Sequence, residues 1–121
     1  MRCISVWRIT HLEKNKIETY LGFCIRSGKI IFGTEMISRQ KKGVKLLISD
    51  GGMGANSFKI MVTAWQTLAC PMVQTEAGLL GELVHRPAVK AVAIKDEHLA
   101  SAILKEVADN PQFKLYSGGN N

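Results

Sequence analysis

The cationic side chains are the residues with the clearest chemical potential, because many of them fall in one short part of the sequence. Lys and Arg total 16 against 10 Asp and Glu, which gives a formal net charge of +6. Six of the basic residues lie between positions 26 and 45, where Glu35 is the one acid: Arg26, Lys29, Arg39, Lys41, Lys42 and Lys45. Such a cluster can neutralise several phosphates of a nucleic acid. A solvated face of charged side chains is the alternative interpretation.

A glycine-rich segment, Gly51 to Gly54, is a second possible site. It lies between an expected strand and an expected helix, where backbone N–H groups can hold a phosphate. It lacks the Gly-Lys-Ser/Thr ending of a P-loop and the full G-x-G-x-x-G spacing, so a flexible turn is the preferred interpretation. Asp50 at the end of the strand invites comparison with a phospho-acceptor, but an Asx turn explains it better.

Other reactive side chains give no pattern that is typical of catalysis or metal binding. His11, His85 and His98 have no i, i+4 partner and no carboxylate at ligand spacing, so we interpret each as a surface residue. The sequence contains no G-x-S-x-G elbow and no recognisable Cys/His nucleophile pair. We therefore expect a protein that is not an enzyme and that uses no metal and no cofactor.

The cysteines and the N-terminal segment bear on the cellular compartment. Cys3, Cys24 and Cys70 are odd in number and widely spaced, which favours reduced thiols over a disulfide framework or a zinc site. The first residues have no apolar run as long as that of a signal peptide, and no run of about 18 apolar residues occurs elsewhere. We expect a cytoplasmic protein with no membrane segment.

The elements that must position these residues alternate between helices and strands. Apolar residues at helical spacing predict a helix over 15–27 that Gly28 ends, and a short second helix for which Thr34 is the expected N-cap. Further helices are expected from about residue 56, with Ile60 among its core-facing residues, over 76–84, and after Asp96 as N-cap. The strands are expected at 44–49, 72–74 and 91–94.

The run from Val44 to Ser49 is almost continuously apolar, which is typical of a strand buried on both faces, and it is the best candidate for the centre of the sheet. Short connections between alternating helices and strands predict α/β layering with helices on both faces of one sheet. A chain of 121 residues fits one domain. We expect that domain over 14–110, an N-terminal extension over 1–13 and a C-terminal tail over 111–121.

Several short strings follow one another in a familiar order between residues 21 and 107. They are Leu21-Gly22, Arg26-Ser27-Gly28-Lys29, Gly33-Thr34-Glu35-Met36, the run from Leu46 to Asp50, Leu80-Gly81, and Ala91 to Ile94 followed by Asp96. Their order and spacing resemble the small bacterial YlxQ-type proteins of the ribosomal L-seven-Ae and L-thirty-e superfamily. Archaeal and eukaryotic members of that superfamily bind kink-turn RNA.

The resemblance implies a three-layer α/β/α sandwich around a mixed sheet of about four strands, with RNA bound at one end by two elements. One element is the start of the second helix, and the other is the loop before the last strand, which covers an extruded base in the kink-turn binders. Carried over, these elements are Gly33, Thr34, Glu35 and Arg39, and Ala88, Val89 and Lys90. The basic residues Arg26, Lys29 and Lys42 complete the expected RNA-binding set.

The sequence departs from the kink-turn motif at the second helix. Kink-turn binders usually have Gly-Thr-Asn-Glu followed two residues later by Lys, and here Glu35, Met36 and Arg39 occupy the Asn, Glu and Lys positions. This form is similar to the bacterial YlxQ type. The implied ligand is therefore a structured, kink-turn-like RNA, with ribosomal RNA and the ribosome as partners of a monomeric protein.

The loop over residues 86–90 has features that suit an unpaired base. Pro87 restricts the backbone, Val89 offers an apolar surface on which a base can rest, and Arg86 and Lys90 flank it with charge. A plain connection whose valine packs inward is the alternative. Two other functions also stay open, a phosphate- or small-ligand-binding domain that uses Gly51 to Gly54 and a protein-interaction module on the same fold.

Overall fold

Five strands form one mixed sheet in the part of the chain that the structure, a computed structural model, describes, which is residues 12–116. The strands are β1 (Ile30–Phe32), β2 (Leu46–Asp50), β3 (Met72–Thr75), β4 (Ala91–Ile94) and β5 (Phe113–Leu115). They lie in the order β1-β4-β2-β3-β5, in which β2 and β3 are parallel and the other neighbours are antiparallel. The predicted mixed sheet is confirmed, with five strands where about four were expected.

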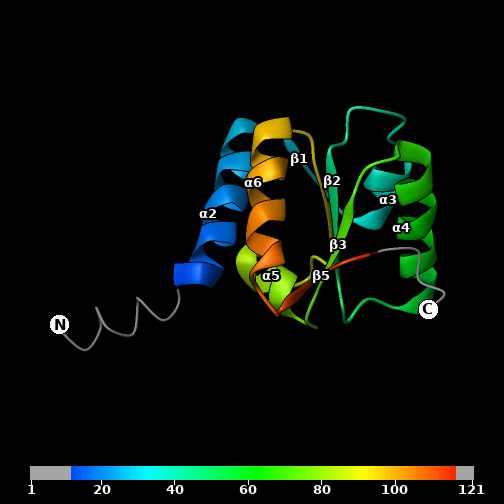
Figure 1. Cartoon of the computed structure of the whole chain (residues 1–121). Helices are drawn as coiled ribbons and strands as arrows, with labels where there is room; N and C mark the ends of the chain where they lie inside the picture. Colours follow the sequence, from blue (N-terminus) through cyan, green and yellow to red (C-terminus); the bar gives the residue numbers. More distant parts are fainter. Residues whose placement is uncertain (1–11, 117–121) are drawn as a thin grey trace, which may run out of the picture.

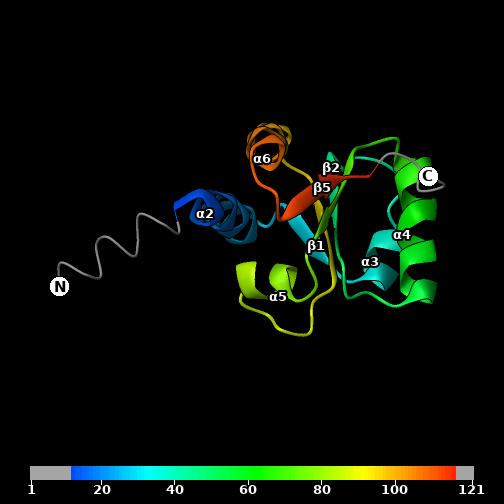
Figure 2. The ribbon, with the colours of Figure 1, turned by 60° about the horizontal axis from the view of Figure 1, so that its bottom comes forward.

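Helices cover both faces of this sheet. They are α2 (Leu12–Ser27), α3 (Thr34–Ser38), α4 (Ala55–Leu68), α5 (Leu79–Leu83) and α6 (Glu97–Ala108). Figures 1 and 2 show α2, α5 and α6 on one side of the sheet and α3 and α4 on the other. The α/β/α layering is therefore confirmed. Within residues 12–116, none of the helices combines the length and the apolar character that crossing a membrane requires.

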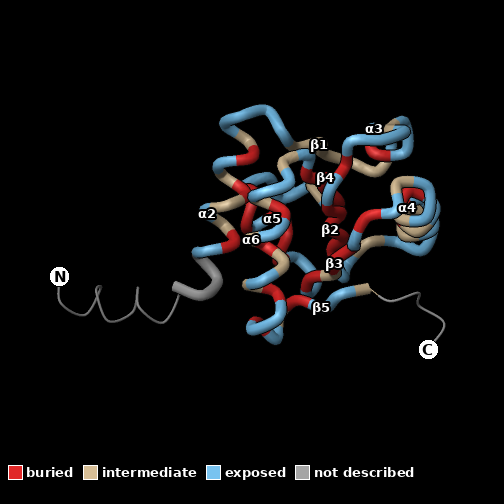
Figure 3. Tube along the Cα trace, turned by 45° about the horizontal axis from the view of Figure 1, so that its top comes forward, coloured by how far each residue is buried: buried red, intermediate tan, exposed pale blue. Residues whose placement is uncertain are grey.

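Strand β2 is the central strand of the sheet, as its apolar run predicted. All five of its residues are buried, and Figure 3 shows this strand in red between the exposed outer segments. Leu46 and Ile48 belong to the core beneath α2, α5 and α6, whereas Leu47 packs in the core beneath α3 and α4. Because successive side chains of a strand point to opposite faces, one short segment supplies both cores.

The first helix begins earlier than predicted. We expected it over 15–27, and α2 begins at Leu12, so the last two residues of the expected 1–13 extension are helical. Its end is as predicted, because Gly28 follows it with a φ of 73°. The rest of the expected extension, residues 1–11, lies outside the described residues.

Glycine sets the starts of two other helices. Thr34 was the expected N-cap of the second helix, but it is the first helical residue, and Gly33 is the N-cap with a φ of 89°. A helix was expected over 76–84, but α5 begins only at Leu79. Gly78 precedes it with a φ of 83°, and that left-handed conformation is incompatible with a continuous right-handed helix.

The two longer helices after β2 follow the predicted pattern closely. Asp96 caps α6 as expected, since its carboxylate accepts a hydrogen bond of 3.0 Å from the amide of Leu99. In α4, Met61 and Ala64 are buried against the sheet. Ile60, which we placed on the core-facing side of this helix, is exposed, because its neighbour Met61 occupies the centre of the buried stripe.

The two edge strands were missed by the sequence reading. Residues 30–32 are a brief apolar stretch for which no strand was predicted, and they pair antiparallel with β4. Residues 113–115 fell in the expected 111–121 tail, but they pair antiparallel with β3, and Phe113 is buried. The sheet therefore extends beyond the predicted boundary at residue 110. Residues 117–121 lie outside the described residues.

Two cysteine thiols are buried in the cores, and we predict that they resist modification in the folded protein. Burial and the nearby charge of Asp96 raise the pKa of Cys24 to about 11, and burial raises the pKa of Cys70. Since the thiolate is the reactive form, iodoacetamide at neutral pH should alkylate both only slowly until urea unfolds the chain. Peptide mass spectrometry resolves the sites, and rapid alkylation of native Cys24 would contradict the buried placement.

Candidate functional site

Three segments that are distant in the sequence line one open hollow of about 470 Å³ at one end of the sheet. The first is the start of α3, the second is the turn from β2 into α4, and the third is the loop before β4. The lining residues are Phe32, Gly33, Thr34, Gly52, Met53, Gly54, Ser57, Ala88, Val89, Lys90 and Ala91. We refer to this feature as the loop hollow.

The pairing of β4 with both of its neighbours brings these segments together. Phe32 at the end of β1 lies opposite Val92, and the next amide, that of Gly33, donates to the carbonyl of Ala91 at 2.9 Å. On the other side, the amide of Asp50 at the end of β2 donates to the carbonyl of Lys90 at 2.8 Å. The start of α3, the turn after β2 and the loop before β4 therefore lie next to one another at one rim. This rim includes the two RNA-binding elements that the resemblance implied.

The loop over 86–90 is held in place at its start. The amide of Arg86 donates to the carbonyl of Gly81 at 2.9 Å, and the amide of Val89 closes a turn onto the carbonyl of Arg86 at 2.9 Å. The Arg86 guanidinium stacks over the ring of Phe32, 4.5 Å from the ring centre. Val89 is half-buried, because it packs against the core beneath α2, α5 and α6 while also lining the loop hollow. Val89 thus packs inward in part, and it also presents apolar surface to the loop hollow.

The carboxylate of Asp50 lies beneath the rim, with no exposed side-chain surface. One oxygen, Oδ2, accepts hydrogen bonds from the amides of Gly52 at 2.9 Å and Gly78 at 3.0 Å. The other, Oδ1, accepts from the Leu80 amide and the Thr75 hydroxyl, both at 3.2 Å. The bond to Gly52 is the predicted Asx turn.

This network determines the ionisation of Asp50. Burial alone would raise the pKa of the carboxyl, but the hydrogen bonds from the three amides and the hydroxyl outweigh it and lower the pKa below its ordinary value. The Lys90 ammonium, 3.7 Å from Oδ2, adds a nearby positive charge while its own side chain stays 44% exposed. An ionised Asp50 thus fixes the turn on one side of the loop hollow.

Both helices that begin at the loop hollow have glycine as N-cap. Gly33 precedes α3 and Gly54 precedes α4, and neither supplies a side-chain hydrogen bond to the first turn. The first amides of a helix have no partner within the helix, and they favour an anionic group. The amides of Gly52 and Met53 are already bonded to Asp50, so the N–H groups that this segment can offer to the loop hollow are those of the first turn of α4.

Not all of the predicted RNA-binding residues lie at this hollow. Gly33, Thr34, Ala88, Val89 and Lys90 line it. Glu35 in the first turn of α3 and Arg39 at its C-cap form an exposed ion pair of 3.3 Å, an arrangement that contributes little to stability.

The remaining three predicted residues, Arg26, Lys29 and Lys42, lie toward the opposite end of the sheet. Lys29 precedes β1, and its carbonyl accepts from the amide of Lys95, which follows β4. The basic residues between positions 26 and 45 could form one continuous surface only if the end of α2 adjoined the outer face of α3. Figures 1 and 2 show α2 and α3 on opposite faces of the sheet, so the basic residues of these two helices do not share one face.

The sequence reading missed three residues that contribute side chains to the loop hollow: Phe32, Met53 and Ser57. Met53 lies within the glycine-rich segment 51–54 and Ser57 follows it closely, so the pattern of that segment pointed to their neighbourhood. Phe32 carried none, because its role depends on the pairing of β1 with β4 and on the stacking of Arg86.

The histidines that the structure describes are at the surface, as interpreted. His85 lies beside Glu18, with 2.6 Å between Nε2 and Oε2, and its side chain is 75% exposed. His98 is also exposed, and His11 lies outside the described residues. Within the described part of the chain, no three His, Cys, Asp or Glu side chains are grouped so that they could hold a metal ion.

Comparison with known proteins supports the fold and leaves the family open. No protein-family model and no curated protein matches the chain. A solved structure of a protein with unknown function from Bacillus halodurans C is similar, with a TM-score of 0.65 and 17% sequence identity. The match covers 75% of this chain and 95% of that one. At this identity the likeness establishes a shared α/β fold.

Proposed function

We propose that the protein binds structured RNA through the loop hollow. The observation that carries the proposal is the convergence of the start of α3, the turn at 52–54 and the loop at 88–91 around a single open hollow. These segments include both elements that the resemblance to the L-seven-Ae and L-thirty-e superfamily implied. The net charge of +6 suits a polyanionic ligand.

The chemistry of the lining suits an RNA segment with an unpaired base. Val89 and Met53 offer apolar surface, and the Phe32 ring with its stacked Arg86 forms one wall. The first-turn amides behind Gly54 offer donors for phosphate oxygens. Sequence-specific RNA recognition uses splayed bases of this kind, because side chains cannot enter the deep groove of an A-form duplex.

The class of RNA and the setting of the protein rest on the resemblance over residues 21–107. The resemblance favours ribosomal RNA in a kink-turn-like conformation as the ligand. It also favours a monomeric, non-enzymatic protein that associates with the ribosome in the cytoplasm. Because Glu35 and Met36 differ from the residues of the kink-turn motif, the proposed ligand class is structured RNA in general.

We predict that a negative charge in the loop hollow weakens RNA binding. Val89→Asp should reduce the affinity for an RNA hairpin with one extruded base by about tenfold or more, since it removes apolar contact and repels phosphate. A uniform RNA duplex should lose less. Because Val89 packs partly on the core, Ala88→Asp at an exposed position of the same loop provides a second variant. Filter binding measures both affinities.

The control for this prediction is Thr19→Asp, which makes the same charge change at an exposed position of α2. Circular dichroism checks the fold of each variant. Hairpin affinity that is unchanged in a folded Ala88→Asp protein would contradict the proposal, and equal losses for hairpin and duplex would leave only nonspecific electrostatics. A panel of nucleotides belongs in the same assay, because tight nucleotide binding without RNA binding would favour the phosphate-binding alternative.

A further inference from the structure

A cationic surface lies at the end of the sheet that is opposite the loop hollow. Lys29 precedes β1, Lys95 follows β4 and Lys45 precedes β2, so three lysines occupy the ends of three adjacent strands. The Lys95 amide donates to the carbonyl of Lys29 at 2.8 Å, and the Lys45 amide donates to the carbonyl of Ile94 at 2.7 Å. Since neighbouring strands are about 4.8 Å apart, the backbones of these lysines lie within roughly 10 Å.

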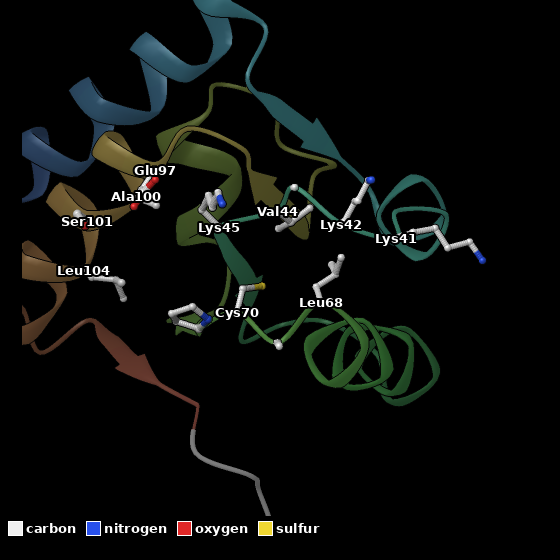
Figure 4. Close-up of a pocket in the computed structure, with 13 residues that line it drawn as sticks. Lys41, Lys42, Val44, Lys45, Leu68, Cys70, Glu97, Ala100, Ser101 and Leu104 are labelled. Carbon is white, nitrogen blue, oxygen red and sulfur yellow. The ribbon is translucent and has the colours of Figure 1, made fainter.

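Two more lysines extend this surface beside an open hollow of about 450 Å³. Lys41 and Lys42 come from the segment between α3 and β2, and they line the hollow together with Lys45, as Figure 4 shows. We call Lys29, Lys41, Lys42, Lys45 and Lys95 the basic end. Nothing in the sequence indicated that Lys95 belongs to this group, because Lys95 becomes a neighbour of Lys29 only through the pairing of β1 with β4.

The charges of the basic end are available to a ligand. All five lysines are exposed, and none of them forms an ion pair with another residue of the described part of the chain. Two acids lie nearby. Asp96 is engaged as the N-cap of α6, and Glu97 lines the hollow. The surface therefore keeps a clear excess of positive charge, which fits a polyanion.

The two surfaces are too far apart to hold one phosphate group in common. Strand β4 lies between Lys90 at the loop hollow and Lys95 at the basic end, and the five residue steps from Lys90 to Lys95 span roughly 17 Å in extended backbone. In Figure 1 the turn that follows β2 is at the bottom of the sheet, and the segment that precedes β2 is at the top. The surfaces therefore face away from each other.

We propose that the basic end binds the phosphate backbone of a second RNA segment, so that one protein molecule bridges two segments. This inference rests on the proposed function for its first segment. The basic end itself offers exposed ammonium groups without an aromatic platform among its five residues, which suits backbone contact without base reading. The expected ligand is thus duplex RNA of any sequence.

The test uses a donor-labelled hairpin with an extruded base and an acceptor-labelled uniform RNA duplex. Wild-type protein should bring the two together and produce energy transfer. The triple variant Lys41→Gln/Lys45→Gln/Lys95→Gln should lose that transfer while its affinity for the hairpin stays within about twofold. Its affinity for the duplex alone should fall roughly tenfold, with a log-log salt slope shallower by about three.

A matched triple variant separates the site from net charge. Lys59→Gln/Lys105→Gln/Lys114→Gln removes three exposed lysines from α4, α6 and β5. Duplex affinity that falls equally in both triple variants would overturn the inference, as would a wild-type protein that binds both RNAs but produces no energy transfer between them. Titrating the duplex against Ala88→Asp protein keeps the two proposals apart, because the basic end should still bind it if the loop hollow binds no RNA.

Discussion

Replacing Asp50 by Asn should lower the free energy of unfolding by about 3 kcal/mol at neutral pH. The Asp50 carboxylate is buried and accepts hydrogen bonds from three backbone amides and the Thr75 hydroxyl. An amide side chain has nearly the same shape, but its NH2 group would face donors where an acceptor is needed. The variant therefore loses hydrogen bonds and leaves buried amides unsatisfied.

The effect of this substitution should depend on pH. The folded state lowers the pKa of Asp50, so the stability that its charge contributes is fully present above the unfolded pKa of about 3.9. That contribution disappears as the pH falls from there through the folded pKa. The difference in stability between the wild type and Asp50→Asn should therefore be constant near neutrality and should narrow in acid.

Urea unfolding followed by circular dichroism at a series of pH values measures this difference. Asp109→Asn is the matched control, because Asp109 is exposed and its substitution should change the stability by less than about 0.5 kcal/mol. If Asp50→Asn were as stable as this control at neutral pH, the buried carboxylate would not anchor the turn. RNA binding by the folded fraction should also weaken, since Gly52 lines the loop hollow.

Gly51→Ala should destabilise the protein by about 2 kcal/mol, because there is no space for a methyl group. A Cβ at this position would lie 2.6 Å from the backbone oxygen of Thr75 and 3.2 Å from the amide nitrogen of Ala77. Backbone atoms at the end of β3 cannot rotate away as a flexible side chain does. The substitution must therefore push apart the ends of the parallel strands β2 and β3.

The matched control is Gly22→Ala in the middle of α2, where the effect should have the opposite sign. The nearest atom to a Cβ there is a guanidinium nitrogen of Arg26 at 3.9 Å, so the methyl group fits. Alanine favours a helix over glycine by up to about 1 kcal/mol. Thermal melting should place Gly51→Ala below the wild type and Gly22→Ala above it. A loss of stability in both would mean that close packing at Gly51 is not the cause.

The sequence was most informative where the residues of a single segment were enough to predict its structure and burial. The apolar run before Asp50 predicted a strand buried on both faces at the centre of the sheet, and β2 occupies that place. The edge strands could not be found in this way. Three residues such as 113–115 have too few positions to establish a period, and their pairing with β3 comes from tertiary contact.

The candidate site was predictable in its parts and not in its arrangement. The resemblance implied Gly33 and Val89, and the glycine-rich turn was identified from its own composition; all three meet at the loop hollow. The position of the basic residues could not be inferred, because Lys29 and Lys95 become neighbours only when β1 pairs with β4. Contacts across a sheet leave no local pattern in either strand.

The pairing partners of β4 also determine when the loop hollow exists during synthesis. Asp50 accepts hydrogen bonds from Thr75, Gly78 and Leu80, which are 25 or more positions later in the chain. The amide of Gly33 bonds to the still more distant carbonyl of Ala91. Closing such long loops is slow compared with forming a helix or a hairpin. A nascent chain that has reached only α5 has α3 and the glycine-rich turn but lacks the strand that joins them. The loop hollow is therefore completed only after β4 has been synthesised and inserted between β1 and β2.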